Sequence, residues 1–364
     1  MTLLITLAQA AIVGDISEPV QFELAGTFAR IFPADEGHWD VALGAGRGIK
    51  FQTVDDDLGS VSQFEDALTD QGFIDIAVTP CPDGGWLVAG SGNVDSHNDT
   101  LWAYRLDANK QVVGNSTVVD RQQNANTNDM VAICTNTVTG VGWANNFAFL
   151  DDQAQVTGTR SMSEFLMGAG MVVVDGLVYI TAAGGPDPKN ITLVVTDGNL
   201  DVQDTRTLEV DVGGDRVYWP QRMLKLDEDT WVIVSMGRDN SQFQADEGNV
   251  YLHFYDASWT HLETTQISQY EGPLGCMRPW VSRSGDTLMV SWDSEIRPYG
   301  VRVTMGGVGS IDTADPADSG DSGDSGGPGD GCGGCGGGSG AGLVLLALPL
   351  MLRRRRIGQS SLFG

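Results

Sequence analysis

A repeating pattern of short apolar strands and turns runs through most of this chain and limits the folds that it can adopt. Between Phe28 and Met305, an apolar stretch leads to a turn and then to a second apolar strand. A longer loop and a strand that ends in an Asp-containing turn complete each unit. The second strand marks the units most clearly, and it begins at Trp39, Trp86, Val141, Leu177, Trp231 and Leu288. The units average about 50 residues, which is long enough for several short strands each.

Units of roughly 40 to 50 residues that hold several short strands are typical of a β-propeller. Alternation of apolar and polar residues with period 2, together with many Val, Thr, Tyr and Trp residues, favours an all-β fold. We therefore predict a six-bladed β-propeller over residues 20–310. Seven blades stay open if the stretch before Phe28 contributes more than a closing strand. A pair of β-sandwich domains is the competing architecture, and the regular spacing without a linker argues against it.

The chain is strongly acidic. Its 364 residues carry a formal net charge of −27, and only four of them are lysines. A surface of this charge repels nucleic acid and anionic membranes, so neither is an expected partner of the folded body. The charge suits a soluble protein in salty surroundings or one that binds Ca²⁺, and a solvated acidic surface is the simpler interpretation.

The C-terminal residues differ in composition from the rest of the chain. Residues 311–340 are rich in Asp, Ser and Gly, which predicts a disordered linker, and this linker contains Cys332 and Cys335. The apolar residues 341–352 would form a helix about 18 Å long, against about 30 Å for a bilayer core. Such a short segment suits temporary retention in a membrane. The residues Arg353, Arg354, Arg355 and Arg356 would hold this end in the cytoplasm.

The Gly-rich motif with Cys332 and Cys335, the short apolar helix and the arginine cluster of residues 341–356 together resemble the MYXO-CTERM sorting signals of myxobacteria and their relatives. That resemblance implies a sorting protease, transient residence in the inner membrane, and attachment or release at the cell surface or outer membrane. It covers only residues 331–356, and the tail departs from the pattern by continuing beyond Arg356. A plain C-terminal membrane anchor is the alternative. A metal site at the two cysteines is not favoured, because no second ligand pair lies nearby.

The N-terminus also indicates export. Residues 3–13 are largely apolar, and Ala8-Gln9-Ala10 fits the A-x-A pattern of a signal-peptide cleavage site, so residues 1–10 are predicted to be a signal peptide. A basic segment before the apolar run is missing. The true start therefore lies upstream of Met1, or the segment is instead the first strand of the fold.

Three cysteines lie in the body of the chain, and an exported protein can oxidise a pair of them. Alignment of the repeats places Cys81 and Cys134 at similar heights in neighbouring units, which predicts a disulfide between them. Cys276 would then be free, or buried as a small hydrophobic residue.

Catalytic and metal-binding motifs are scarce. The sequence contains no G-x-S-x-G elbow, no H-E-x-x-H and no P-loop lysine, and its four histidines are scattered. We therefore expect no cofactor except calcium, for which two acidic clusters are weak candidates, because Ca²⁺ takes six to eight oxygen ligands. Neither cluster has the spacing of an EF-hand, and solvated turns are the competing interpretation. The candidate ligands are Asp55, Asp57, Asp95 and Asp99.

Three arginines form a more specific pattern. Arg30 and Arg222 each lie nine residues before Trp39 and Trp231, and Arg278 lies ten before Leu288. These registers place them on the innermost strands of units one, five and six, which are neighbours in a closed six-bladed ring. Two aromatic residues, Trp219 and Trp280, are close in sequence.

Such a cluster could bind a carboxylate or an acidic sugar beside an aromatic platform. The competing interpretation is that the arginines neutralise acidic residues near the axis. The function predicted is non-catalytic recognition of an extracellular glycan, peptide or matrix protein by a surface-displayed propeller. One alternative is a hydrolase or lyase that acts on an acidic polysaccharide, and another is a structural surface-layer component. An enzyme should show a deep pocket with a carboxylate, His or Tyr near the arginines.

Overall fold

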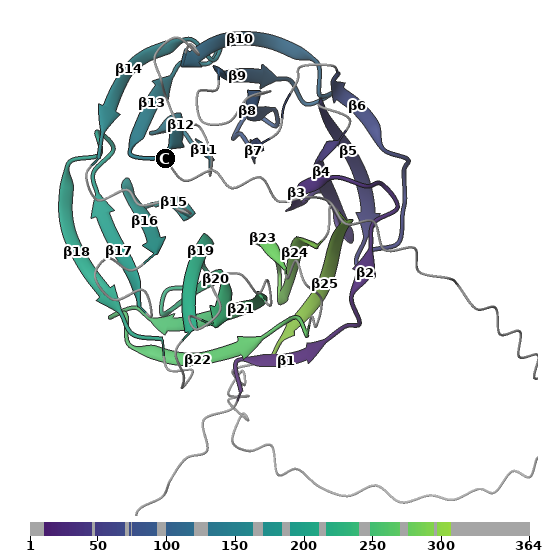
Figure 1. The fold of residues 1–364 in the computed structure, drawn as a ribbon, viewed down its shortest axis with the longest axis vertical. Coiled ribbons are helices and arrows are strands. Elements are labelled where there is room, and N and C mark those ends of the chain that lie inside the picture. The colour runs from purple at the N-terminus through teal and green to yellow at the C-terminus, as the bar shows by residue number, and fades with distance from the viewer. Residues whose placement is uncertain are drawn as a thin grey trace, which may run out of the picture. The chain divides into compact units, whose positions relative to one another are not determined.

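The body of the chain forms six antiparallel sheets arranged in a ring, with one sheet for each repeat (Figure 1). The structure is a computed structural model that describes residues 11–45, 48–69, 73, 75–92, 100–119, 130–162, 170–183, 190–210, 216–239, 248–269, 276–294 and 297–306. These residues form strands and turns and contain no helix. The predicted all-β, six-bladed propeller is therefore confirmed.

Blades 1 to 5 each contain four consecutive strands, numbered from the axis outwards. Blades 1 and 2 are β3 (Thr27–Pro33), β4 (His38–Ala45), β5 (Gly48–Asp55) and β6 (Glu65–Leu68), then β7 (Asp75–Pro80), β8 (Trp86–Gly92), β9 (Thr100–Leu106) and β10 (Val112–Val119). Blades 3 and 4 are β11 (Val131–Cys134), β12 (Thr139–Trp143), β13 (Asn146–Leu150) and β14 (Val156–Ser161), then β15 (Gly170–Val174), β16 (Leu177–Ala183), β17 (Ile191–Thr196) and β18 (Val202–Leu208). Blade 5 is β19 (Arg216–Lys225), β20 (Thr230–Asp239), β21 (Asn249–Asp256) and β22 (His261–Gln266).

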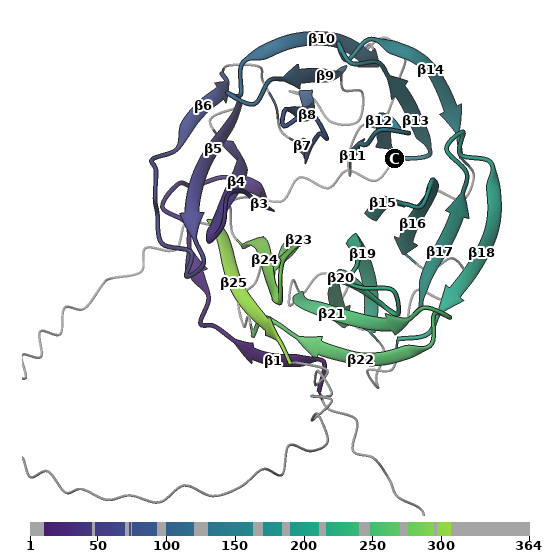
Figure 2. The same cartoon turned by 180° about the vertical axis from the view of Figure 1, so that it is seen from behind.

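Blade 6 joins the two ends of the propeller. Its inner strands are β23 (Met277–Ser284), β24 (Thr287–Ser294) and β25 (Arg297–Met305), and its outer strands come from the N-terminal region as β1 (Val13–Ile16) and β2 (Val20–Gln21). Both outer strands pair antiparallel with β25 (Figure 2). The N-terminal stretch thus supplies closing strands and no seventh blade. The sequence predicted that the propeller starts at residue 20, but its first strand begins at Val13.

The same turn joins the third and fourth strands of blades 1 to 5. In each turn an Asp Oδ1 accepts hydrogen bonds from the backbone N–H groups two and four residues later. The residue three positions after the Asp has a positive φ of 57° to 69°. This geometry explains the Asp-containing turns of the repeat, because a short acidic side chain can satisfy two backbone donors locally. The five Asp residues are Asp55, Asp107, Asp151, Asp197 and Asp256.

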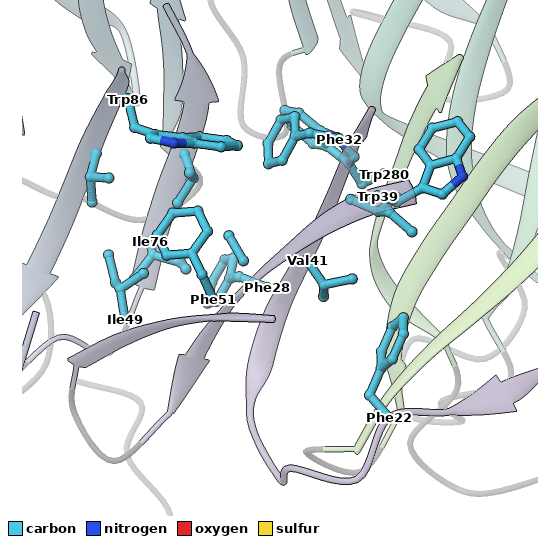
Figure 3. Packing of buried hydrophobic residues seen from close by; sticks show 14 of the residues in the cluster. Phe22, Phe28, Phe32, Trp39, Val41, Ile49, Phe51, Ile76, Trp86 and Trp280 are labelled. Carbon is cyan, nitrogen blue, oxygen red and sulfur yellow. The ribbon is translucent and has the colours of Figure 1, made fainter. Parts of the chain in front are cut away.

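Aromatic side chains join neighbouring blades in the core. The ring centroid of Trp86 in blade 2 lies 5.3 Å from that of Phe32 and 4.9 Å from that of Phe51, both in blade 1. Phe32 also lies 5.5 Å from Trp280 of blade 6. Figure 3 shows these side chains packed together between the sheets. Edge-to-face contacts of this kind stabilise the contacts between blades beyond the burial of apolar area.

A disulfide joins Cys81 of blade 2 to Cys134 of blade 3, with their Cα atoms 5.0 Å apart. This is the pair that the alignment of the repeats predicted. Cys276 is free and buried, and burial raises the pKa of its thiol to about 11. The disulfide thus crosslinks two adjacent blades.

The predicted targeting segments lie outside the described residues. These segments are residues 1–10, the linker with Cys332 and Cys335, and the apolar segment with the four arginines. The chain divides into two compact units, Met1–Ser310 and Ile311–Gly364, and the described residues all belong to the first. Nothing in the described part is a helix long and apolar enough to cross a bilayer.

Candidate functional site

The three arginines singled out in the sequence lie on the innermost strands of three successive blades. Arg222 is on β19, Arg278 on β23 and Arg30 on β3, and these strands surround the central axis (Figure 1). Arg30 Nη1 donates a hydrogen bond to the backbone oxygen of Arg278 at 2.8 Å, which links blades 1 and 6 directly. The tertiary structure therefore brings together residues up to 248 positions apart in the chain.

A β-bulge interrupts each of the three inner strands near its arginine. The pairing register shifts between Thr27 and Arg30, and it shifts again between Pro220 and Arg222 and between Met277 and Trp280. A bulge adds a residue to one strand and changes the direction of its side chains.

Two of the bulged residues have a left-handed backbone, with φ values of 58° at Phe28 and 53° at Arg278. Non-glycine residues rarely adopt this conformation, and in folded proteins such strain gathers at functional sites.

Because of the bulges, the three arginines are not aligned as the sequence predicted. Arg30 pairs with Ala42 and Arg222 with Val234, each three residues after the start of the middle-strand motif. In blade 6 the equivalent position, opposite Ser291, is occupied by Trp280. Arg278 itself lies within the bulge. Counting residues in the sequence missed this shift, although the spacing of ten residues instead of nine was its signal.

Two cations contact the ring of Trp280. The Cζ atom of Arg222 is 4.3 Å from the centroid of the Trp280 ring, and that of Arg30 is 4.7 Å from it. Arg278 contacts a different ring, with its Cζ atom 4.3 Å from the centroid of Phe28. Guanidinium groups bind aromatic faces most strongly where water is excluded. Trp280 and Phe28 are both buried, so the rings hold the arginines in fixed positions.

A carboxylate that the sequence analysis did not identify completes the cluster. Asp293, on β24, has a side chain that is only 1% exposed, and its Oδ2 accepts a hydrogen bond from Arg278 Nη1 at 2.6 Å. Its Oδ1 accepts the backbone N–H of Phe28 at 3.0 Å. Burial raises the pKa of Asp293, while Arg278 and Arg30 oppose that shift. The only signal in the sequence was an Asp next to the apolar motif that begins at Leu288.

Arg222 differs from Arg278, which pairs with Asp293, and from Arg30, whose pKa Asp293 influences: no described carboxylate does either for Arg222. Its Nη1 is 3.5 Å from the backbone oxygen of Met171, and its buried Nε has no hydrogen-bond partner. Within the described ranges no carboxylate pairs with it. Burial lowers the pKa of Arg222 to about 10. Burial also lowers the pKa of Arg30 to about 10, where Asp293 opposes the shift and Arg278 and Arg222 add to it.

Five predicted site residues remain, and the structure describes the side chains of two of them, Asp55 and Asp57. Nothing is described of the Trp219 side chain, and Asp95 and Asp99 lie outside the described residues. Asp55 is the first residue of an Asp-containing turn, and Asp57 Oδ1 accepts a hydrogen bond from Arg302 Nη1 at 2.7 Å. Both carboxylates therefore have structural partners. The described part of the chain contains no group of three His, Cys, Asp or Glu residues that could hold a metal ion.

One histidine is fully buried, in blade 5. His253 Nε2 is 2.7 Å from Ser235 Oγ and its Nδ1 is 3.0 Å from Thr264 Oγ1. Burial lowers the pKa of His253 to about 3, and His261 adds to the shift. Because Ser235 and His253 are both fully buried, this hydrogen-bond chain stabilises the blade and gives a substrate no access.

Comparison with known proteins shows the fold alone. No family model matches this sequence, and no curated protein matches it. Among solved structures, a protein of unknown function from Dyadobacter fermentans DSM 18053 is similar at a TM-score of 0.60 and 11% identity, over 80% of this chain and 99% of that one.

Two other solved structures match with lower TM-scores. A subtype N10 neuraminidase-like protein of A/little yellow-shouldered bat/Guatemala/060/2010 has a TM-score of 0.49 and 11% identity, over 82% of this chain and 99% of that one. A GH43 β-1,3-galactosidase has a TM-score of 0.44 and 10% identity, over 66% and 93%. At such identities, shared fold carries no shared activity.

Proposed function

We propose that this protein is an exported recognition module whose propeller binds a carboxylate-bearing ligand, an acidic glycan or peptide, at the arginine cluster of blades 5, 6 and 1. The cluster consists of Arg30, Arg222 and Arg278 with Trp280 and Asp293. A carboxylate accepts two parallel hydrogen bonds from a guanidinium, so arginine suits such a ligand better than lysine does.

The observation that carries this proposal is the state of Arg222. Arg222 is half-buried, and its Nε is closed off from solvent. A guanidinium that is partly removed from water normally has an acidic partner, because the full desolvation of an ion costs several kcal/mol. Arg222 has only a ring and one long hydrogen bond, in a chain with 48 acidic residues. An acid from the chain itself would be easy to supply at this position. Its absence from the described residues fits a position that a ligand's carboxylate completes.

The state of Asp293 favours recognition over hydrolysis or lyase chemistry. A general acid or base must reach the substrate. Both oxygens of Asp293 already accept hydrogen bonds, and its side chain is 1% exposed. No other carboxylate contacts the three arginines in the described part of the chain. The cluster can therefore hold an anion but offers no free group to transfer a proton.

Binding of oligogalacturonate or another oligouronate, measured by isothermal titration calorimetry, tests the proposal. The Arg222→Gln variant removes the unpaired cation and should weaken binding at least tenfold, while near-ultraviolet circular dichroism stays unchanged. Arg160→Gln removes the same charge from an exposed ion pair with Asp201 and is the matched control. Equal affinity of Arg222→Gln and the wild type would overturn the proposal. Turnover of the oligouronate by the wild type would favour the enzymatic alternative instead.

Surface display rests on the C-terminal tail and needs a separate test. Intact mass and fractionation of the natively expressed protein should show a mature species without the apolar segment and its arginines. The variant carrying Cys332→Ala and Cys335→Ala should accumulate at full length. A full-length wild-type protein held in the inner membrane would instead indicate a plain anchor.

A further inference from the structure

A groove lies between blades 1 and 2, and none of the three clustered arginines lines it. It has a volume of about 540 Å³ and is formed by the turn after β3, the end of β7 and the turn between β9 and β10. Pockets of this size accommodate small ligands. Pro33 at the end of β3 lines the groove, whereas Phe28, in contact with Arg278, lies near the beginning of the same strand.

The groove combines apolar walls with a small set of polar groups. Trp86 lines the groove and packs against Phe32 and Phe51. The polar groups are carboxylates, an imidazole, a hydroxyl and an ammonium, and they come from both blades. The other apolar residues are Pro33, Ala34, Val61, Pro80 and Ala108, and the polar residues are Asp35, His38, Asp40, Thr53 and Lys110.

Asp40 is the centre of the polar side. Its Oδ1 accepts a hydrogen bond from Thr53 Oγ1 at 3.0 Å and lies 3.4 Å from Lys110 Nζ. Both contacts use the same oxygen, so Oδ2 has no partner among the described residues. The side chains of Asp35 and His38 also have no hydrogen-bond partner there. The groove therefore offers several unused acceptors beside one ammonium donor.

The position of Lys110 is set by its turn. Lys110 is the left-handed residue of the Asp107 turn, with φ of 62°. Its Nζ lies 5.0 Å from the centroid of the Phe51 ring. The ammonium thus contacts both an aromatic ring of blade 1 and the carboxylate of Asp40. Only 25% of the Lys110 side chain is exposed.

The geometry points to this groove as a binding site for an uncharged carbohydrate segment. A hydroxyl group can donate to Asp40 Oδ2 and accept from Lys110 Nζ at the same time, which neither a carboxylate nor an ammonium can do. An anionic ligand would meet Asp35 and Asp40. A cationic ligand that reached Asp40 would lie against Lys110. The apolar walls suit the C–H faces of a sugar ring.

Backbone amide and Trp Nε1–H NMR spectra, recorded with neutral disaccharides, test this inference. Cellobiose, maltose and lactose are the probes, with spermidine and citrate as cationic and anionic comparisons. At least one disaccharide should shift the Trp86 and Thr53 signals in a saturable way. Absence of any saturable shift at tens of millimolar sugar, or shifts with spermidine or citrate instead, would overturn it.

Two variants attribute the shifts to the groove. Lys110→Ala removes the ammonium donor, and Ala108→Trp fills the groove from an exposed turn position without removing a hydrogen bond. Each should weaken sugar binding at least tenfold. Asp66→Asn, which breaks the separate Lys50–Asp66 ion pair of blade 1, should leave it unchanged. Arg222→Gln should also leave it unchanged, so that failure of the arginine-site proposal and failure of this one are separable.

Discussion

The guanidinium of Arg222 lies 4.3 Å from the centroid of the Trp280 ring and has no acidic partner in the described part of the chain. In the adjacent blade Arg278 is bonded to the buried Asp293. One arginine is therefore paired with a buried carboxylate and the other is not. Removing the positive charge should change the free energy of unfolding in opposite directions at the two positions.

We expect Arg222→Met to raise the free energy of unfolding by about 1 kcal/mol, because it removes a desolvated charge and keeps an apolar contact with Trp280. Arg278→Met should lower it by about 3 kcal/mol, because it leaves the carboxylate of Asp293 buried and unpaired. Urea unfolding at pH 7 measures both. The loss in Arg278→Met should shrink at acidic pH, where Asp293 becomes protonated. Equal losses in the two variants would contradict this assignment of the charges.

The disulfide should contribute substantially to stability. It closes a loop with a sequence separation of 53 residues, for which the chain-entropy model gives about 4 kcal/mol. The variant with Cys81→Ser and Cys134→Ser should unfold at lower urea than the wild type. A reducing agent should destabilise the wild type alone, and Cys276→Ala should keep the wild-type response to it. Insensitivity of the wild type to reduction would show that the bond does not form in solution.

Two adjacent residues, Asp151 and Asp152, allow a test of how much the Asp-containing turns contribute to stability. Asp151 Oδ1 accepts hydrogen bonds from the backbone N–H groups of Gln153 and Gln155 at 3.0 and 2.7 Å. Replacing it with Ala should lower the free energy of unfolding by about 1 to 2 kcal/mol. Asp152→Ala makes the same change of charge at an exposed neighbour and should have an effect of less than about 0.5 kcal/mol. Thermal unfolding compares the two, and similar shifts would mean that charge alone matters.

The buried His253 predicts a specific dependence of stability on pH. Its folded-state pKa is about 3, against 6.5 for an ordinary His, so the unfolded state binds more protons between these values. The stability that neutral His253 contributes is present above about pH 6.5 and is lost as the pH falls toward 3, by at most about 1.4 kcal/mol per pH unit. Urea unfolding of the wild type and His253→Gln from pH 7 to pH 4 should show a steeper decline in the wild type. Parallel curves would mean that His253 is not buried as a neutral side chain.

Closure of the ring depends on a close backbone approach at Gly306. A Cβ atom at this position would lie 2.5 Å from the backbone oxygen of Ala11, next to β1. Gly306→Ala should therefore displace β1, speed amide hydrogen exchange in Val13–Ile16, and lower the free energy of unfolding by about 1 to 3 kcal/mol. Gly198→Ala, whose Cβ would make an ordinary 3.5 Å contact with Val138, should be neutral or stabilising. Unchanged amide hydrogen exchange in β1 would show that closure of the ring does not depend on the close approach at Gly306.

The sequence by itself determined the features that depend on neighbouring residues and on the period of the repeat. Alternating apolar residues predicted the strands, and Asp residues such as Asp197 marked turns, because both signals act within a few residues. The regular period predicted six blades and placed Cys81 and Cys134 at matching heights. It also placed Arg30, Arg222 and Arg278 on neighbouring blades.

Only the tertiary structure decided what happens where the chain departs from that regularity. The bulges put Trp280, and not Arg278, level with Arg30 and Arg222. Folding buries Asp293, which pairs with Arg278, and gives Arg222 no acidic partner among the described residues. The N-terminal strand β1 closes blade 6. Each of these outcomes depends on pairing and burial between residues far apart in the chain, and local sequence patterns carry no information about such contacts.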